Sequence, residues 1–171
     1  FHIYGSGTED FPDFLATDFS DSQIFSIEQP VLKKILKSVV FAASSDETRP
    51  AFNGVFVTLD NNKIRLMASD TYRLVIKEVE NDSWSYDQAT FLIPAKSIRE
   101  LLRIIGDEGI VNINFLKNLI SFQFNNVNFS TRLLSEKYPD VSGVIPQSYK
   151  TRIKINRKRL EETMGRTSLL A

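Results

Sequence analysis

The segment Ser69–Leu74, read as SDTYRL, places an acid, an aromatic ring and a guanidinium between two apolar stretches. Two interpretations are open. In the first, the segment is a polar turn in which Arg73 pairs with Asp70 while Leu74 joins the core. In the second, it is one wall of a docking pocket, since arginine offers several hydrogen-bond donors and an apolar neighbour can hold an apolar anchor.

The sequence offers little that could perform catalysis. His2 is the only histidine and stands near the beginning of the chain, and there is no phosphate-binding GxxxxGK loop and no GxSxG nucleophile elbow. Cysteine is absent, which excludes disulfides and cysteine-based zinc sites. A metal-dependent nuclease remains an alternative, because several acids fall in predicted loops, although turns also attract aspartate for backbone reasons. These acids are Asp46, Glu47, Asp70 and Asp140. We expect no catalytic residue, no metal and no cofactor.

Composition indicates a globular protein with no net charge. The chain has 171 residues, of which 42% are hydrophobic and 25% charged, and 13 phenylalanines supply bulky core anchors. Lysine plus arginine equals aspartate plus glutamate at 21 each, so binding to nucleic acid would depend on where the charges lie. No apolar run approaches the roughly 20 residues that a membrane helix needs. The chain starts at Phe1 and stops within a helical pattern, so we expect a piece of a longer protein.

Hydrophobic periodicity predicts strands and helices in a repeating order. A strand at 23–27 precedes a helix at 30–43, which Pro30 suits as a first-turn residue. Strands follow at 55–59, 64–68 and 75–79, and a polar loop follows at 80–88. The order then recurs as a strand, a helix and three strands, at 89–94, 95–105, 111–115, 120–124 and 127–133.

This recurrence is an internal repeat with an offset of 66 residues. Its apolar positions Phe25, Ile27, Leu32, Ile35, Leu36 and Val39 return as Phe91, Ile93, Ile98, Leu101, Leu102 and Ile105. A weaker match lies 128 residues on and pairs Phe25 and Ile27 with Ile153 and Ile155, ahead of a helical pattern from 156. We therefore predict an α+β domain of two strand-helix-meander repeats, with two helices packed on antiparallel sheets, and a further domain beginning near Ser148.

The basic residues of the two helices repeat as well. The same offset carries Lys33 to Arg99 and Lys37 to Arg103, and Lys96 lies one turn before Arg99. An ordinary solvated helix face explains either helix by itself. Two such helices side by side would instead form a positive strip suited to phosphates rather than to bases.

Several stretches resemble one protein family. FAASSDETRPAFNGVFV at 41–57 and KIRLMASDTYRL at 63–74 resemble the central domain of the bacterial β sliding clamp, the processivity subunit of DNA polymerase III. EKYPDVSGVIP at 136–146 resembles the segment that closes that domain, EDFPDF at 9–14 resembles the exit from the first domain, and RKRLEETMGRTSLL at 157–170 resembles the first helix of the third. The resemblance implies a linker at 1–20, the central domain at 21–147 and the truncated start of the third domain at 148–171.

The resemblance further implies a DNA-clamp fold and a cytoplasmic protein that catalyses no reaction. The intact protein would form a homodimeric ring around double-stranded DNA. Polymerase III alpha subunit, clamp loader, repair polymerases and mismatch-repair proteins would dock short peptide motifs, and no membrane is involved. The implied peptide pocket comprises Arg49, Ala51, Phe52, Ser69, Thr71, Tyr72, Arg73, Leu74, Pro139 and Val144. Lys96 matches a DNA-facing position, and helix geometry adds Lys33, Lys37, Arg99 and Arg103.

Four positions depart from the family pattern. Thr71-Tyr72 stands where the family often has Gly-His, Ala51 replaces an aromatic residue of some relatives, and Gly143 stands where a basic residue can occur. These changes predict an altered peptide preference and one missing contact at the pocket rim. Besides the nuclease, the remaining alternative is a β-rich adaptor without a role on DNA.

Overall fold

The computed structural model describes residues 23–116 and 118–169, together with residues 2, 4, 5, 7 and 9. Most of the linker predicted at 1–20 lies outside the described residues. The chain divides into two compact units, Phe1–Tyr138 and Pro139–Ala171. Each unit is described by itself below.

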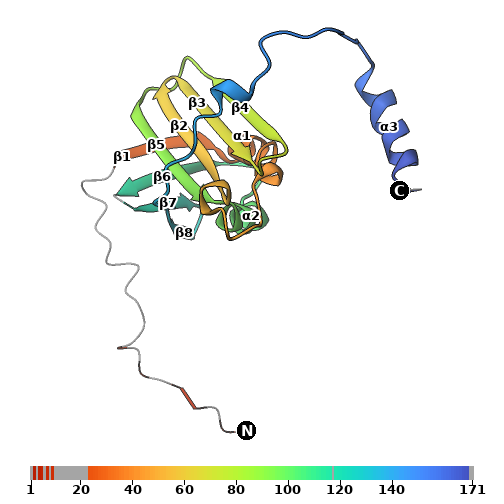
Figure 1. Cartoon of the computed structure of the whole chain (residues 1–171). Helices are drawn as coiled ribbons and strands as arrows, with labels where there is room; N and C mark the ends of the chain where they lie inside the picture. The colour runs from red at the N-terminus through yellow and green to blue at the C-terminus, as the bar shows by residue number, and fades with distance from the viewer. Residues whose placement is uncertain are drawn as a thin grey trace. The chain divides into compact units, whose positions relative to one another are not determined.

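The first unit contains two four-stranded antiparallel sheets and two α-helices, in the order β1, α1, β2, β3, β4, β5, α2, β6, β7, β8 (Figure 1). One sheet has the strand order β1-β6-β7-β8 and the other β4-β3-β2-β5. The strands span Gln23–Glu28, Gly54–Asn61, Lys63–Ser69, Leu74–Glu80, Tyr86–Pro94, Ile110–Leu116, Leu119–Phe124 and Val127–Arg132, and the helices span Gln29–Lys37 and Ala95–Ile104. The predicted α+β architecture of two repeats is confirmed.

The two repeats exchange their first strands. β1 precedes α1 in the first repeat but pairs with β6 of the second, with Phe25 opposite Ile113. β5 begins the second repeat but pairs with β2 of the first, with Phe91 opposite Val57. Phe91 and Phe115 then meet edge to face at 4.4 Å, where the two sheets face each other. Each sheet is therefore complete only when both repeats are present.

Both helices bury one apolar face and contact each other (Figure 1). Leu32, Ile35 and Leu36 of α1 are buried in the same core as Ile98 and Leu101 of α2. Burial of an aliphatic side chain stabilises by roughly 1.5–3 kcal/mol, so these faces hold the helices against the sheets. The opposite faces stay in solvent, which is where the basic residues lie.

Gln29 fixes the start of α1 against the loop that follows α2. It is fully buried, and its backbone N–H donates to the Gly109 carbonyl at 2.9 Å. Its side-chain Oε1 accepts from the Gly106 N–H, also at 2.9 Å. Gly109 has a φ of +88°, and a β-carbon there would approach the Gln29 Nε2 to 3.0 Å, so glycine is required for this contact.

The predicted helix at 30–43 is too long. α1 ends at Lys37, and residues Val40–Ala42 form a separate 3₁₀ turn. The Ser38 hydroxyl donates to the Ile35 carbonyl at 2.7 Å and so competes with the next helical turn. Val39 and Val40 are buried. The backbone leaves the regular helix before them, and their β-branched side chains pack in the core.

Two other predictions need correction. The polar loop predicted at 80–88 is shorter, because β5 already begins at Tyr86, whose ring packs edge to face on Phe25 at 5.0 Å. The weaker repeat match predicted a strand at Ile153 and Ile155, but residues 151–156 form no strand. Both isoleucines are exposed, and a strand needs a partner strand that the described residues do not provide here.

The second unit contains a 3₁₀ turn at Ser142–Val144 and the helix α3 at Arg157–Thr167. Asn156 caps α3, since its side-chain oxygen accepts from the Arg159 N–H at 3.2 Å. The helix predicted from 156 is thus present. None of its residues is buried, so its stability within the described structure depends on capping rather than on packing.

Candidate functional site

The SDTYRL segment is a hydrogen-bonded turn between β3 and β4. The Asp70 Oδ1 accepts from the backbone N–H of Tyr72 at 3.1 Å and of Arg73 at 3.0 Å. The Ser69 hydroxyl donates to the Arg73 carbonyl at 2.8 Å and accepts from the Thr71 N–H at 3.1 Å. Short polar side chains therefore complete the backbone bonding of the turn, while Tyr72 projects into solvent with 95% of its surface exposed.

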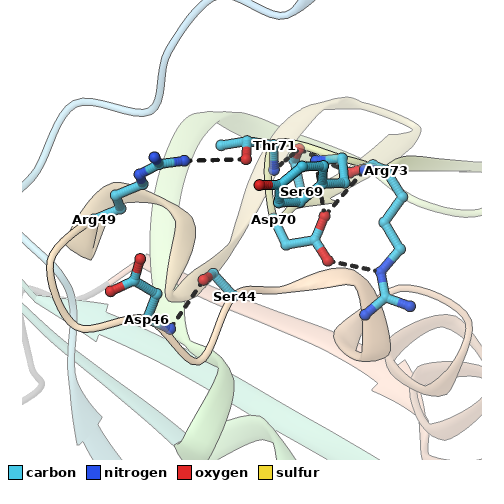
Figure 2. Close-up of polar contacts among 8 residues, drawn as sticks. Ser44, Asp46, Arg49, Ser69, Asp70, Thr71 and Arg73 are labelled. Carbon is cyan, nitrogen blue, oxygen red and sulfur yellow. Dashed lines mark hydrogen bonds and ion pairs between the residues drawn. The ribbon is translucent and has the colours of Figure 1, made fainter.

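Thr71 holds an unusual backbone conformation with a φ of +78°. A β-branched residue at positive φ is strained and persists only where its surroundings hold it. Figure 2 shows the Arg49 guanidinium reaching Thr71, and Nη1 donates to Oγ1 at 3.1 Å. The hydrogen bond thus ties Thr71 to the loop that precedes β2.

Arg73 is held by two groups at once. Its Nε forms an ion pair with the Asp70 Oδ2 at 2.9 Å, as the turn interpretation predicted (Figure 2). Its guanidinium carbon lies 5.8 Å from the centre of the Phe41 ring. Partial burial would raise the pKa of the Asp70 carboxyl. The N–H donors of Arg73 and Tyr72 and the Arg73 charge outweigh that effect, so the pKa of Asp70 lies below its usual range.

The turn and the loop after α1 enclose an open hollow of about 280 Å³. The loop is shaped by Asp46, whose N–H donates to the Ser44 hydroxyl at 3.0 Å (Figure 2). The Asp46 Oδ1 also accepts from the Thr48 N–H and hydroxyl. These bonds from Thr48 lower the pKa of Asp46. The hollow is lined by Ala43, Ser44, Ser45, Asp46, Arg49, Asp70, Tyr72 and Arg73. The structure therefore brings together Arg49, Tyr72 and Arg73 of the predicted pocket.

The predicted apolar floor is not part of this hollow. Phe52 is half-buried and meets the Tyr138 ring edge to face at 6.0 Å, and Tyr138 stacks on Phe56 at 5.2 Å. Burial raises the pKa of Tyr138 to about 12. Ala51 and Leu74 are also half-buried, and Ser69 is buried beneath the turn. Pro139 and Val144 belong to the second unit, where Val144 is 66% exposed.

The loop acids do not gather around a metal. Asp46 and Asp70 accept hydrogen bonds from their own loops, and Asp140 accepts from the Ser142 N–H at 2.9 Å, which lowers its pKa. Among the residues that the structure describes, no three histidine, cysteine, aspartate or glutamate side chains form a candidate metal site. The geometry thus gives the nuclease alternative no support.

The basic residues of α1 and α2 lie on the solvent faces of two helices in contact. Lys37, Lys96, Arg99 and Arg103 are exposed, and Lys33 is mostly covered, with 19% of its side chain exposed. Lys33 forms an ion pair with Asp107 at 2.8 Å, and its bond and charge lower the pKa of Asp107. Arg103 pairs with Glu100 at 3.0 Å. Within the described residues, Lys37, Lys96 and Arg99 form no ion pair and are the cations most available to a ligand.

Sequence reasoning missed two residues. Lys34 is exposed and lines the same surface hollow as Lys33 and Lys37. Its spacing of three residues from Lys37 indicates that the two lysines share one face of α1. Phe41 was assigned to a helix, and no pattern in the sequence indicated its contact with Arg73. No described helix is long and apolar enough to span a membrane.

Comparison with known proteins identifies the family. The family model of the DNA polymerase III beta subunit, central domain, matches residues 26–140. The beta sliding clamp of Bacillus subtilis is 31% identical over 172 residues, which covers 100% of this chain and 45% of the relative.

Solved structures agree with the sequence match. A DNA polymerase sliding clamp from Bacillus subtilis has a TM-score of 0.89 at 32% identity, covering 96% of this chain and 43% of that one. A DNA polymerase III beta chain from Streptococcus pneumoniae has a TM-score of 0.87 at 34% identity, covering 98% and 44%. The chain spans less than half the length of these relatives, and it belongs to the DNA polymerase III beta subunit family, the beta sliding clamps.

Proposed function

We propose that the whole protein is the processivity factor of a bacterial replicative DNA polymerase. It would close as a homodimeric ring around duplex DNA and tether the polymerase without catalysing a reaction itself, in the cytoplasm. Family membership and the two-repeat fold support this function. We assign residues 1–20 to a linker from the first domain, 21–147 to the central domain and 148–171 to the start of the third.

The observation that carries the proposal is the contact between two helices with cations on their exposed faces. We assign Lys37, Lys96 and Arg99 as phosphate contacts, with Lys33 and Arg103 contributing charge that Asp107 and Glu100 partly neutralise. Flexible cations facing phosphates bind without reading the sequence, and their affinity falls steeply with salt. A ring needs only such weak contacts, because closure rather than affinity keeps it on the duplex.

We propose that partners dock short peptides at the hollow formed by the β3–β4 turn and the loop after α1. Arg49, Thr71, Tyr72 and Arg73 would form the polar rim of this hollow. The family resemblance assigns Ala51, Phe52, Ser69 and Leu74, and Pro139 and Val144 of the second unit, to peptide binding as well. The partners would be the polymerase alpha subunit, the clamp loader, repair polymerases and mismatch-repair proteins. The exposed Tyr72 ring offers a larger apolar stacking surface than a histidine would.

Primer extension on a circular single-stranded template tests the central proposal. Polymerase with its clamp loader should make long products from one binding event only when the intact protein is present. Products of unchanged length would contradict a clamp function. Incubating labelled duplex with the protein and Mg²⁺ or Mn²⁺ serves as the control, since cleavage abolished by Asp70→Asn would instead favour the nuclease.

Peptide docking has a separate test. A fluorescent peptide from a polymerase tail should bind the intact protein, and Arg73→Ala should weaken binding by about tenfold because a hydrogen-bond donor at the rim is lost. Lys137→Ala, an exposed cation outside the hollow, is the matched control and should leave binding unchanged. Equal binding by Arg73→Ala would remove this residue from the site.

A further inference from the structure

The strand β4 has a second hollow at its other end. The hollow described above begins beside Arg73, at the start of β4, whereas this one is lined by Val79 and Glu80 at its end. At about 3.4 Å per residue, the two ends of β4 lie roughly 20 Å apart. The second hollow is therefore a distinct surface. Its volume is about 450 Å³, in the range of ligand-binding pockets.

Half of the residues that line the second hollow are apolar, and they include the chain's only tryptophan. Trp84 is half-buried, its backbone N–H donates to the Asn81 carbonyl at 2.9 Å, and its ring packs on Tyr86 at 5.6 Å. Val31 and Val79 are also half-buried, and Ile110 is 58% exposed. A rigidly held indole beside exposed aliphatic side chains is the composition of an interaction site.

All charges that line this hollow are negative. Glu28 and Glu80 are its charged residues, and no lysine or arginine lines it. Glu80 pairs with Lys63 at 2.9 Å, but Glu28 is exposed and forms no ion pair with any described residue. A free carboxylate next to an indole face attracts a cation, both by charge and by the ring quadrupole.

We propose that the surface around Trp84, formed by Glu28, Val31, Val79, Glu80, Trp84 and Ile110, docks a short peptide of a partner protein in which lysine or arginine alternates with apolar residues. The apolar side chains pack on Trp84, Val31 and Ile110, and a basic side chain pairs with Glu28. The chain's own residues before β1 do not suit this surface, since they contain acids and no lysine or arginine precedes Lys33.

Trp84 makes the test direct. The 171-residue chain is titrated with a capped peptide that alternates lysine and isoleucine and lacks aromatic residues, while tryptophan emission is recorded. Because Trp84 is the only tryptophan, a saturable change in emission reports this surface alone. Backbone amide NMR shifts should change together at residues 26–29, 31, 79–84 and 110 and stay unchanged at 69–74.

Charge variants decide the interpretation. Glu28→Lys should weaken binding by at least about tenfold, because it reverses the free charge of the surface. Glu136→Lys makes the same change at an exposed acid outside the surface and should leave binding within about twofold. Circular dichroism confirms that both variants are folded. Arg73→Ala should bind the probe unchanged, which separates this surface from the proposed clamp pocket.

Four results would overturn the proposal. They are the absence of a saturable change, equal binding of a peptide with glutamate in place of lysine, unaltered binding by Glu28→Lys, and self-association that Glu28→Lys abolishes. The last result would assign the surface to a second copy, whose residues 152–155 also alternate basic and apolar side chains. None of these results bears on the primer-extension test.

Discussion

The two repeats of the first unit share one plan but differ in their connections. In the first repeat, residues 38–53 join α1 to β2 through two 3₁₀ turns, and residues 70–73 join β3 to β4. In the second repeat, residues 105–109 join α2 to β6, and residues 125–126 join β7 to β8. The hollow assigned to peptide docking is made of the longer connections alone. The strands and helices are thus a shared scaffold, and the site is an addition to one repeat.

Backbone strain follows the same division. The tight turn of the second repeat has Asn125 at a φ of +50°, which asparagine tolerates well. The wide turn of the first repeat has Thr71 at +78°, where a β-branched residue is strained. Strained residues that are held by their neighbours concentrate at functional sites. The strained turn is therefore the one that lines the hollow assigned to peptide docking.

The largest expected effect comes from separating the repeats. Because β1 pairs with β6 and β5 pairs with β2, residues 23–84 and 85–138 should each be unfolded alone. Circular dichroism of the two pieces should show little regular structure, and mixing them should restore the spectrum of the intact unit. Cooperative thermal unfolding of either piece by itself would contradict the exchange of strands.

Matched core truncations should differ between the repeats. Leu36 of α1 is 2% exposed, whereas its counterpart Leu102 of α2 is half-buried. Leu36→Ala should lower the free energy of unfolding by about 3 kcal/mol, and Leu102→Ala by about half as much, since less apolar surface leaves water there. Urea denaturation measures both. Equal losses would show that the two helices are packed alike.

Much of the scaffold could be predicted from the sequence, because apolar side chains alternate along Val55–Leu59 and Ile64–Ala68 and follow helical spacing from Ile98 to Leu102. The exchange of first strands could not, since pairing between distant strands leaves no local pattern. α1 was predicted too long because Val39 and Val40 continue its apolar spacing while the core takes them out of the helix. The site residues were expected from family resemblance, and the contacts of Arg49 with Thr71 and of Arg73 with Phe41 emerged only in three dimensions.

Glycine substitutions at the two turns should have unequal effects. Thr71→Gly should raise the free energy of unfolding by about 0.5–1 kcal/mol, because relief of strain exceeds the added entropy of the unfolded chain. Asn125→Gly should change it by less than about 0.5 kcal/mol. Thermal unfolding followed by circular dichroism compares the two variants. A loss of stability in Thr71→Gly would contradict the prediction and mean that the lost hydrogen bond from Arg49 outweighs the strain.

The smallest expected effect is the response of the wide turn to acid. The pKa of Asp70 is lowered in the folded state, so its contribution to stability is complete above the unfolded value of about 3.9 and is lost as the pH falls through the folded pKa. NMR titration of the Asp70 carboxyl carbon should give a midpoint below about 3.9. Amide exchange at Tyr72 and Arg73 should rise over the same range. An Asp70 midpoint above about 3.9 would contradict the hydrogen bonds from the Tyr72 and Arg73 N–H groups to its carboxylate.

The most direct test of the clamp proposal is retention of the intact ring on nicked circular DNA as salt is raised, with charge reversed on one helix at a time. Lys34→Glu with Lys37→Glu on α1, and Lys96→Glu with Arg99→Glu on α2, should each lower loading and retention, while Lys137→Glu with Lys77→Glu on other elements should not. Retention that is unchanged by reversal on both helices would contradict the assignment of this face to DNA.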